Sequence, residues 1–258
     1  MKQRIITAAL AGIFFLGLAV IGGVAFSLLV ILMALVGYLE FLRMGKITPY
    51  SFPAVIGFIL VIFIVPPFNF SLLSPAEVIL SAFLLLLVYT VLSKNTFHFD
   101  QAAFVILASL YVGFGFHYLI EARVSGNGIN VLFFILLLIW TTDSGAYFTG
   151  RAMGKRKLWP QISPKKTIEG AAGGIVAALV VAVLYQLLFS VSESMVMVVL
   201  AAVVIAVFSQ IGDLVESAFK RHYGVKDSGS FLPGHGGILD RCDSWLFVLP
   251  VMHLFHFI

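Results

Sequence analysis

Charged residues are scarce in this sequence. Asp, Glu, Lys and Arg make up 11% of its 258 residues, hydrophobic residues make up 61%, and the mean hydropathy is +1.08. A soluble globular domain has about 25% charged and about 45–50% apolar residues. The composition therefore excludes an ordinary soluble domain and indicates a polytopic integral membrane protein.

Cysteine and alternating strand patterns are also lacking. Cys242 is the single cysteine of the chain, which excludes an internal disulfide. A membrane barrel would show alternating apolar and polar residues, whereas this chain shows unbroken apolar runs. Because lipid cannot satisfy open backbone groups, we expect an all-α fold. The N-terminus has no clear small-x-small cleavage site, so we interpret it as a first span rather than a signal peptide.

Nine apolar stretches approach the length of about 20 residues that a helix needs to cross a bilayer. They lie at roughly 5–21, 24–42, 53–68, 74–92, 102–120, 130–150, 168–190, 194–214 and 242–258. Turn residues separate them at Gly22-Gly23, Pro66-Pro67 and 125–128. We predict about nine transmembrane helices in one membrane domain, 1–258. Residues 1–128 would form scaffold or dimer helices, and residues 129–258 the catalytic helices and loops.

The basic residues predict the orientation of these spans. With the N-terminus inside, 15 of the 16 Lys and Arg residues fall in cytoplasmic segments, and Arg123 is the exception. The polar loops 151–166 and 215–241 then share the cytoplasmic side, and the C-terminus lies outside. We expect a multi-pass protein of the inner cell membrane with a cytoplasmic active site.

Three carboxylates lie at the ends of the last two predicted spans. Asp213 ends the eighth, while Asp240 and Asp243 are three residues apart at the start of the ninth, so a helix would place both on one face. Ionisable residues in spans are functional candidates by default. Mg²⁺ takes carboxylate oxygens and usually shares substrate phosphates and water. We predict that Asp213, Asp240 and Asp243 hold Mg²⁺, with a second cation possible; helix capping by either Asp240 or Asp243 is the alternative.

A glycine-rich loop precedes Asp240. His235, Gly236 and Gly237 lie in it, and backbone N–H groups of such loops can approach phosphates closely. The helix N-terminus that follows also favours an anion. We predict that these three residues contact substrate phosphates, although His235 can equally be a loop histidine without a role.

Glu216 and Lys220 follow Asp213 at helical spacing on about the same face. For this pair we favour a solvated ion pair over a ligand role.

A second polar region, 140–174, follows the sixth predicted span. Asp143 lies within that span, and Tyr147 follows one turn later. Ser163-Pro164 predicts a helix start, with Thr167 and Glu169 in the first helical turn. Lys165 and Lys166 would then stand at the membrane surface beside a helix N-terminus, as phosphate ligands. For Arg156 and Lys157 we favour the role of a positive-inside anchor.

Three glycines begin the seventh predicted span: Gly170, Gly173 and Gly174. Small residues at this spacing allow helices to approach closely in membranes. We interpret them as packing residues rather than ligand contacts.

These residues carry a resemblance to a known family. The stretch S-A-F-K-R-x4-K-D-S-G-x2-L-P-G-H-G-G-I-L-D-R-C-D, residues 217–243, resembles the signature of the CDP-diacylglycerol synthases, or phosphatidate cytidylyltransferases. DSGAYFTGR and ISPKKTIEG are similar to upstream blocks of that family. The resemblance is sharp over 140–244 and general, in hydrophobicity, before it.

The resemblance implies transfer of CMP from CTP to phosphatidic acid, giving CDP-diacylglycerol and pyrophosphate in a Mg²⁺-dependent homodimer. It implies that Asp227 and Asp143 support the three metal ligands. Basic side chains would serve substrate phosphates: Lys220, Arg221, Lys226 and Arg241. The expected partners are CTP, phosphatidic acid and membrane lipid, without nucleic acid.

Two other function classes stay open at this point. An ion-coupled transporter would use Asp143 and Asp213 as intramembrane sites, but the basic and glycine-rich loops and the lack of a visible inverted repeat disfavour it. Another membrane phosphotransferase or lipid phosphatase is the second alternative. The aspartate spacing of CDP-alcohol phosphotransferases is not found in the chain.

Overall fold

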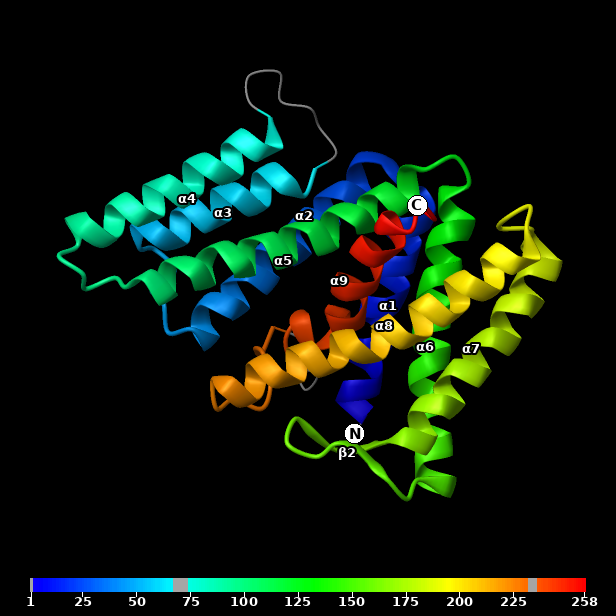
Figure 1. Cartoon of the computed structure of the whole chain (residues 1–258). Coiled ribbons are helices and arrows are strands. Elements are labelled where there is room, and N and C mark those ends of the chain that lie inside the picture. Colours follow the sequence, from blue (N-terminus) through cyan, green and yellow to red (C-terminus); the bar gives the residue numbers. More distant parts are fainter. Residues whose placement is uncertain (1, 67–73, 232–235) are drawn as a thin grey trace. The chain divides into compact units, whose positions relative to one another are not determined.

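The computed structural model describes residues 2–66, 74–231 and 236–258. These residues form helices and one small hairpin (Figure 1). The helices are α1 (Lys2–Ile21), α2 (Gly23–Met44), α3 (Phe52–Ile64), α4 (Pro75–Leu92), α5 (Phe99–Val124), α6 (Gly128–Met153), α7 (Ile168–Phe189), α8 (Met195–His222) and α9 (Leu239–Leu254), and the strands are β1 (Lys157–Trp159) and β2 (Ser163–Thr167). Each predicted apolar stretch is thus a helix, and α8 extends two turns beyond its predicted end.

Six of these helices are long and apolar enough to cross a membrane, judged over the described residues by length and composition: α2, α4, α5, α6, α7 and α8. Large apolar side chains such as Ile21 and Val24 stay exposed, as expected of surfaces that face lipid. The all-α multi-pass class is therefore confirmed. Nine crossings remain a prediction, because α3 and α9 are short for a full span.

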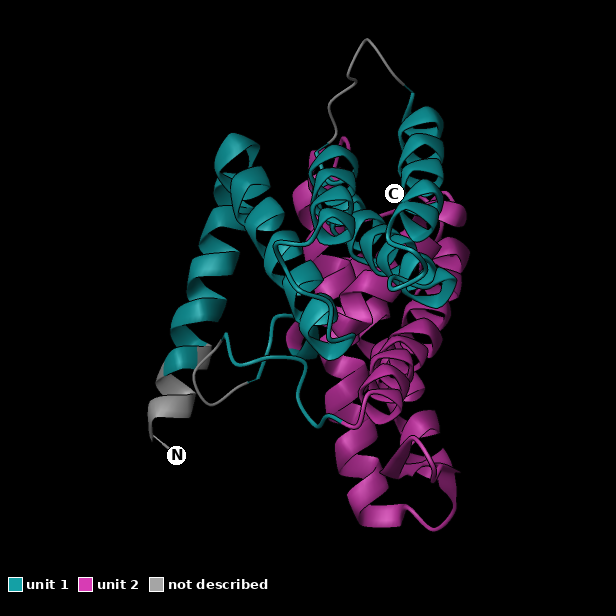
Figure 2. Cartoon of the chain, turned by 90° about the vertical axis from the view of Figure 1, so that its left-hand side faces the viewer, with its two compact units in different colours: residues 1–120, 225–240 teal, residues 121–224, 241–258 magenta. Residues whose placement is uncertain are grey.

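The chain divides into two compact units, each described by itself (Figure 2). Unit 1 comprises residues 1–120 and 225–240, and unit 2 comprises residues 121–224 and 241–258. The loop before α9 therefore belongs to the N-terminal helices, although it is far from them in sequence.

Aromatic contacts hold the helices of unit 1 together. Tyr38 of α2 packs edge-on against Phe58 of α3, with ring centroids 4.8 Å apart. Phe41, one turn later, meets Tyr111 of α5 at 5.9 Å. At the predicted break between α1 and α2, Gly22 takes a positive φ of 69°, a conformation that glycine adopts without strain.

Glycines bring α6 and α7 of unit 2 into close contact, and Figure 1 shows the two helices side by side. A Cβ at Gly174 would lie 2.7 Å from the carbonyl oxygen of Thr142, and a Cβ at Gly170 would lie 2.8 Å from that of Ala146. Gly173 packs against Thr149 of α6. The packing interpretation of these glycines is confirmed.

The predicted helix start at Ser163-Pro164 is wrong. Residues 163–167 are strand β2, antiparallel to β1, and Thr167 pairs with Lys157. Thr167 is the N-cap of α7, because its Oγ1 accepts the N–H of Gly170 at 3.1 Å. The helix therefore begins at Ile168, and Lys165 and Lys166 belong to a strand.

Glu169 fastens the start of the hairpin to α7. Its Oε2 accepts the N–H groups of Lys155 at 3.0 Å and Arg156 at 3.1 Å, and its Oε1 pairs with the Arg156 guanidinium at 3.3 Å. Arg156, expected to be a membrane anchor, thus has a structural partner. These bonds explain why the chain turns back as a hairpin before the helix begins.

Candidate active site

Lys166 and Asp213 form an ion pair in unit 2. The Nζ of Lys166 lies 2.7 Å from Oδ2 of Asp213, and the Lys166 side chain is 25% exposed. Its neighbour Lys165 is exposed. Successive side chains of a strand point to opposite faces, so β2 directs Lys166 to the carboxylate and Lys165 away from it. The structure thereby separates two lysines that the sequence could not distinguish.

Three carboxylates from three helices of unit 2 act on one another electrostatically. Asp143 of α6 and Asp243 of α9 are both repelled by Asp213 of α8, and Asp143 also repels Asp243. Two lysines oppose this negative charge: Lys166 attracts Asp143, and Lys220 attracts Asp243. Three carboxylates facing two ammonium groups leave a cluster that favours a further cation.

Hydrogen bonds orient two of these carboxylates. Oδ1 of Asp213 accepts the hydroxyl of Ser217 at 3.3 Å, one turn along α8. Oδ1 of Asp243 accepts the N–H of Ser244 at 2.7 Å. Gly212 allows α8 and α9 to approach here, since a Cβ at that position would lie 2.9 Å from the carbonyl oxygen of Asp243.

The oxygen ligands of these aspartates suit a magnesium ion that also binds water and substrate, rather than one enclosed by protein ligands alone. Across 2–66, 74–231 and 236–258, no group of three His, Cys, Asp or Glu side chains stands close enough to hold a metal ion alone. Mg²⁺ commonly binds one or two carboxylates and completes its shell with water and substrate phosphates. Asp213 and Asp243, with Asp143 nearby, have the oxygen chemistry that this mode requires.

Glu216 and Lys220 form an ion pair one turn apart on α8, but the pair is buried. The Lys220 Nζ lies 2.5 Å from Oε2 of Glu216, and the side chains are 14% and 2% exposed respectively. The expectation of a solvated pair is therefore wrong. Because α8 continues to His222, these residues lie on a packed helix instead of in a solvated loop.

Asp240 belongs to unit 1, whereas Asp213 and Asp243 belong to unit 2. Oδ2 of Asp240 accepts the N–H of Ser228 at 2.8 Å, the N–H of Gly237 at 2.9 Å and the Ser228 hydroxyl at 3.0 Å. Asp240 thus closes the loop that precedes α9. Its role as a metal ligand stays a prediction.

The glycines of this loop fit against carboxylates of the protein itself. Gly236 has a φ of 84°, and a Cβ there would lie 2.5 Å from Oδ2 of Asp240. The N–H of Gly237 already donates to that oxygen. The Gly237 N–H thus has a partner within the protein, and the phosphate contacts predicted for Gly236 and Gly237 stay a prediction. His235 lies outside the described residues.

The remaining predicted residues are basic, acidic or aromatic side chains at the surface. Lys226, Asp227 and Arg241 are exposed, and Tyr147 stacks edge-on against Phe148 at 5.3 Å. Arg221 donates its Nε–H to the carbonyl oxygen of Ile162 at 3.3 Å, which ties the end of α8 to the hairpin.

Glu40 of α2 is a residue that the sequence analysis missed. It is 1% exposed and accepts the N–H groups of Ile238 at 2.8 Å and Leu239 at 3.0 Å, together with the Ser228 hydroxyl at 2.9 Å. A signal was available: Glu40 is the single charged residue in the predicted span 24–42, and ionisable residues in spans are functional candidates.

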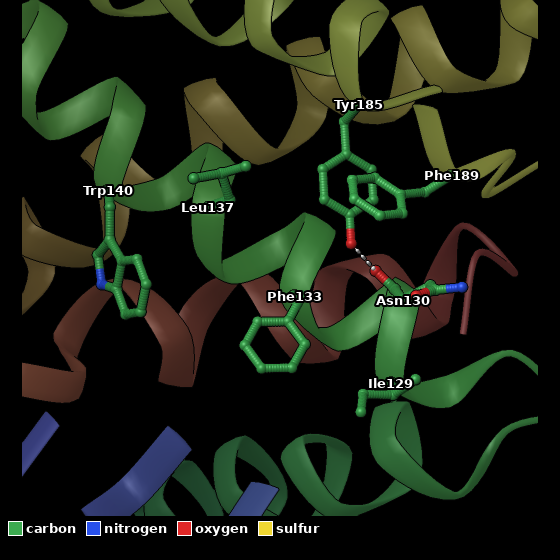
Figure 3. Close-up of a pocket in the computed structure, with 7 residues that line it drawn as sticks. All are labelled: Ile129, Asn130, Phe133, Leu137, Trp140, Tyr185 and Phe189. Atoms are coloured by element: carbon green, nitrogen blue, oxygen red, sulfur yellow. Dashed lines mark hydrogen bonds between the residues drawn. The ribbon is translucent and has the colours of Figure 1, made fainter. Parts of the chain in front are cut away.

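An apolar pocket of about 330 Å³ lies between α6 and α7 (Figure 3). Its lining residues are Ile129, Asn130, Phe133, Leu137, Trp140, Tyr185 and Phe189. The Tyr185 hydroxyl donates to the carbonyl oxygen of Asn130 at 3.2 Å. This lining holds no charged side chain.

Comparison with known proteins identifies the family of the chain. The model of the cytidylyltransferase family matches residues 2–258. The chain is 51% identical to the phosphatidate cytidylyltransferase of Bacillus subtilis (strain 168), over 98% of this chain and 96% of the relative. It is 44% identical to the protein of that name from Staphylococcus epidermidis (strain ATCC 12228 / FDA PCI 1200) and 43% identical to that from Staphylococcus aureus (strain COL), each over 98% of both chains.

The fold is that of an all-α multi-pass membrane protein with a carboxylate and lysine cluster in unit 2, and the relatives identify a cytidylyltransferase. The chain belongs to the cytidylyltransferase family, and the resemblance seen in the sequence is confirmed.

Proposed function

We propose that this protein transfers CMP from CTP to the phosphate of phosphatidic acid, giving CDP-diacylglycerol and pyrophosphate. The observation that carries the proposal is the similarity, over nearly the whole chain, to relatives named phosphatidate cytidylyltransferase. The lysine and carboxylate cluster of unit 2 supports it, because the reaction joins two polyanions.

In this reaction a phosphate oxygen of the lipid attacks the α-phosphorus of CTP. The bond from that phosphorus to the oxygen shared with the β-phosphate breaks, and pyrophosphate leaves. The lipid phosphate is already ionised near neutral pH, so no strong general base is needed. The protein has to neutralise charge and align the two phosphates in line.

Lys166 is the side chain best placed to neutralise phosphate charge. It is partly exposed, and its ammonium group is held by Asp213 at 2.7 Å. The Asp213 contact keeps the lysine side chain oriented. Lys220, Arg221, Lys226 and Arg241 are further proposed phosphate contacts, on the basis of the family resemblance.

Asp213 and Asp243 would hold Mg²⁺, with Asp143 as a supporting carboxylate. Asp240 and Asp227 remain candidates from the sequence, and a second cation is possible. Bound Mg²⁺ would supply positive charge to the phosphate oxygens that develop charge during transfer. The three carboxylates and their hydrogen bonds would fix where that charge acts.

We further propose that the site faces the cytoplasm of a cell membrane and that the protein acts as a homodimer. The distribution of basic residues supports the cytoplasmic orientation. The homodimer rests on the family resemblance alone.

One assay tests the proposed reaction. Purified full-length protein in detergent micelles receives labelled CTP, Mg²⁺ and phosphatidic acid. We expect pyrophosphate release together with a CMP-bearing lipid. Diacylglycerol, which lacks the attacking phosphate, is the matched control and should give no product. Absence of a CMP-bearing lipid with phosphatidic acid would overturn the proposal.

A further inference from the structure

The N-terminus of α9 is bonded to a carboxylate from a distant part of unit 1. The first N–H groups of a helix have no partner within the helix and attract negative charge. In this protein Glu40 meets that need: its Oε1 accepts the N–H of Ile238 at 2.8 Å, and its Oε2 accepts the N–H of Leu239 at 3.0 Å. Glu40 is therefore an internal hydrogen-bond acceptor at the start of α9.

Ser228 links Glu40 to Asp240. Its hydroxyl lies 2.9 Å from Oε2 of Glu40 and 3.0 Å from Oδ2 of Asp240, and its N–H donates to the same Asp240 oxygen at 2.8 Å. Two carboxylates thus share one hydroxyl group. A displacement of Glu40 would change the donors around Asp240 as well.

The surrounding glycines are fitted to Glu40. A Cβ at Gly229 would lie 2.7 Å from Oε1 of Glu40, and a Cβ at Gly237 would overlap the same carboxylate. Gly37, one turn before Glu40 on α2, lies against Leu239. Close backbone approach on both sides shows that the loop is built around this one side chain.

We propose that Glu40 is a positioning residue for cytidylyl transfer: it holds Ser228 and the start of α9 on α2 and, through Ser228, sets the orientation of Asp240. This inference rests on the proposed function, because it assigns Asp240 a part in the Mg²⁺-dependent reaction. The proposal adds a residue outside the 217–243 signature to those that the reaction requires.

Glu40→Gln tests the proposal with little change in shape. The amide keeps one acceptor but turns an NH₂ group toward groups that are themselves donors. Partners that orient metal ligands typically change metal affinity or activity by about 10- to 100-fold when they are replaced. We expect the Mg²⁺ concentration for half-maximal rate to rise by about that factor, with a smaller change in KM for CTP. Ser228→Ala, which removes the link but leaves Glu40 and its two N–H bonds, should shift the Mg²⁺ dependence in the same direction.

Glu77→Gln is the matched control. Glu77 is an exposed carboxylate of unit 1 that closes the capping box of α4 with Ser74, so this variant should keep the wild-type Mg²⁺ dependence.

Hydrogen–deuterium exchange gives a readout that does not need activity. Glu40→Gln should speed exchange in the peptide that covers 236–240, while peptides of α6 and α7 stay unchanged. Faster exchange with unaltered turnover and Mg²⁺ dependence would reduce Glu40 to a structural residue and overturn the proposal. Unaltered exchange would overturn it too. If Glu40→Gln does not fold, a normal Mg²⁺ dependence of Ser228→Ala would refute the link to Asp240. An inactive wild-type protein would instead defeat the proposed function, with the exchange result still deciding whether Glu40 holds the loop.

Discussion

Lys166 on strand β2 and Asp213 in the middle of α8 are joined by an ion pair of 2.7 Å, whereas Lys165, the adjacent residue, is exposed. The two lysines have the same chemistry and differ by one position in a strand. They therefore form a matched pair for testing which one meets phosphate.

We predict that Lys166→Ala lowers turnover by about 10²- to 10³-fold, the loss typical of removing one preorganised donor to a developing charge. Lys165→Ala should stay within a few-fold of wild type. Initial rates of CMP transfer, with thermal unfolding to confirm folding, measure both. If both variants lose only a little turnover, the hairpin lysines would act as a membrane anchor and not as phosphate ligands.

Asp213→Asn should lower the rate at least about 100-fold, which corresponds to roughly 2.7 kcal/mol of transition-state stabilisation. Asn has nearly the same shape, so the loss would report the missing charge. The exposed Asp100 of α5 provides a matched control, and Asp100→Asn should be active. A folded Asp213→Asn protein with normal rate and Mg²⁺ dependence would show that the metal lies elsewhere.

Calcium should bind the site but support the reaction poorly. Mg²⁺ requires near-octahedral oxygens at about 2.0–2.1 Å, whereas Ca²⁺ prefers a looser shell at about 2.3–2.6 Å. Replacing Mg²⁺ with Ca²⁺ in the assay should therefore lower the rate, and adding Ca²⁺ to the Mg²⁺ enzyme should inhibit it. Equal rates with the two ions would contradict a magnesium site of this kind.

The Glu216–Lys220 pair should matter for stability. Removing one partner of a buried ion pair typically costs about 3–5 kcal/mol. Glu216→Leu alone should therefore lower the free energy of unfolding in detergent by about that much. The double variant Glu216→Leu/Lys220→Met should recover part of the loss, because neither charge remains. A single variant as stable as wild type would mean that the pair is effectively solvated, as its sequence spacing first indicated.

Gly174→Ala should destabilise unit 2, since its Cβ would lie 2.7 Å from the backbone oxygen of Thr142. Overpacking of this kind typically costs about 1–3 kcal/mol. Gly17→Ala on α1 is the control, because nothing lies within 4 Å of a Cβ at that position. Unfolding midpoints in detergent compare the two, and equal midpoints would argue against tight packing of α6 on α7.

The helices were predictable because each coincides with an apolar run long enough to dominate local structure. The hairpin was not, because Ser163-Pro164 and Thr167 both satisfy the rules for a helix start. What decides between them is Glu169, which fastens Lys155 and Arg156 to the true N-terminus of α7. Such contacts between distant residues carry no periodic signal.

The candidate site, like the fold, was predictable only in part from the sequence. Spacing along α8 correctly related Glu216 to Lys220, but burial depended on how far the helix continues. Glu40 is separated from Ile238 by almost 200 positions, and nothing in the local sequence connects them. The sequence analysis predicted a shared role for Asp213 and Asp243 with Asp143 in support, and the fold places all three in unit 2, whereas Asp240 belongs to unit 1.

The connectivity of the two units limits how this enzyme can be rearranged. The chain passes from one unit to the other between Gly224 and Val225, just after α8, and at two points inside helices: between Ile120 and Glu121 in α5, and between Asp240 and Arg241 in α9. A cut at either point would divide a helix. The N–H and C=O groups at the new helix ends would then lack hydrogen-bond partners in or near lipid. Each unit is also built from two separate stretches of the chain, so neither can be taken out as one continuous segment. Glu40 of α2 is likewise bonded to the backbone of Ile238 and Leu239, so a change on α2 alters the start of α9 despite the distance between them along the chain.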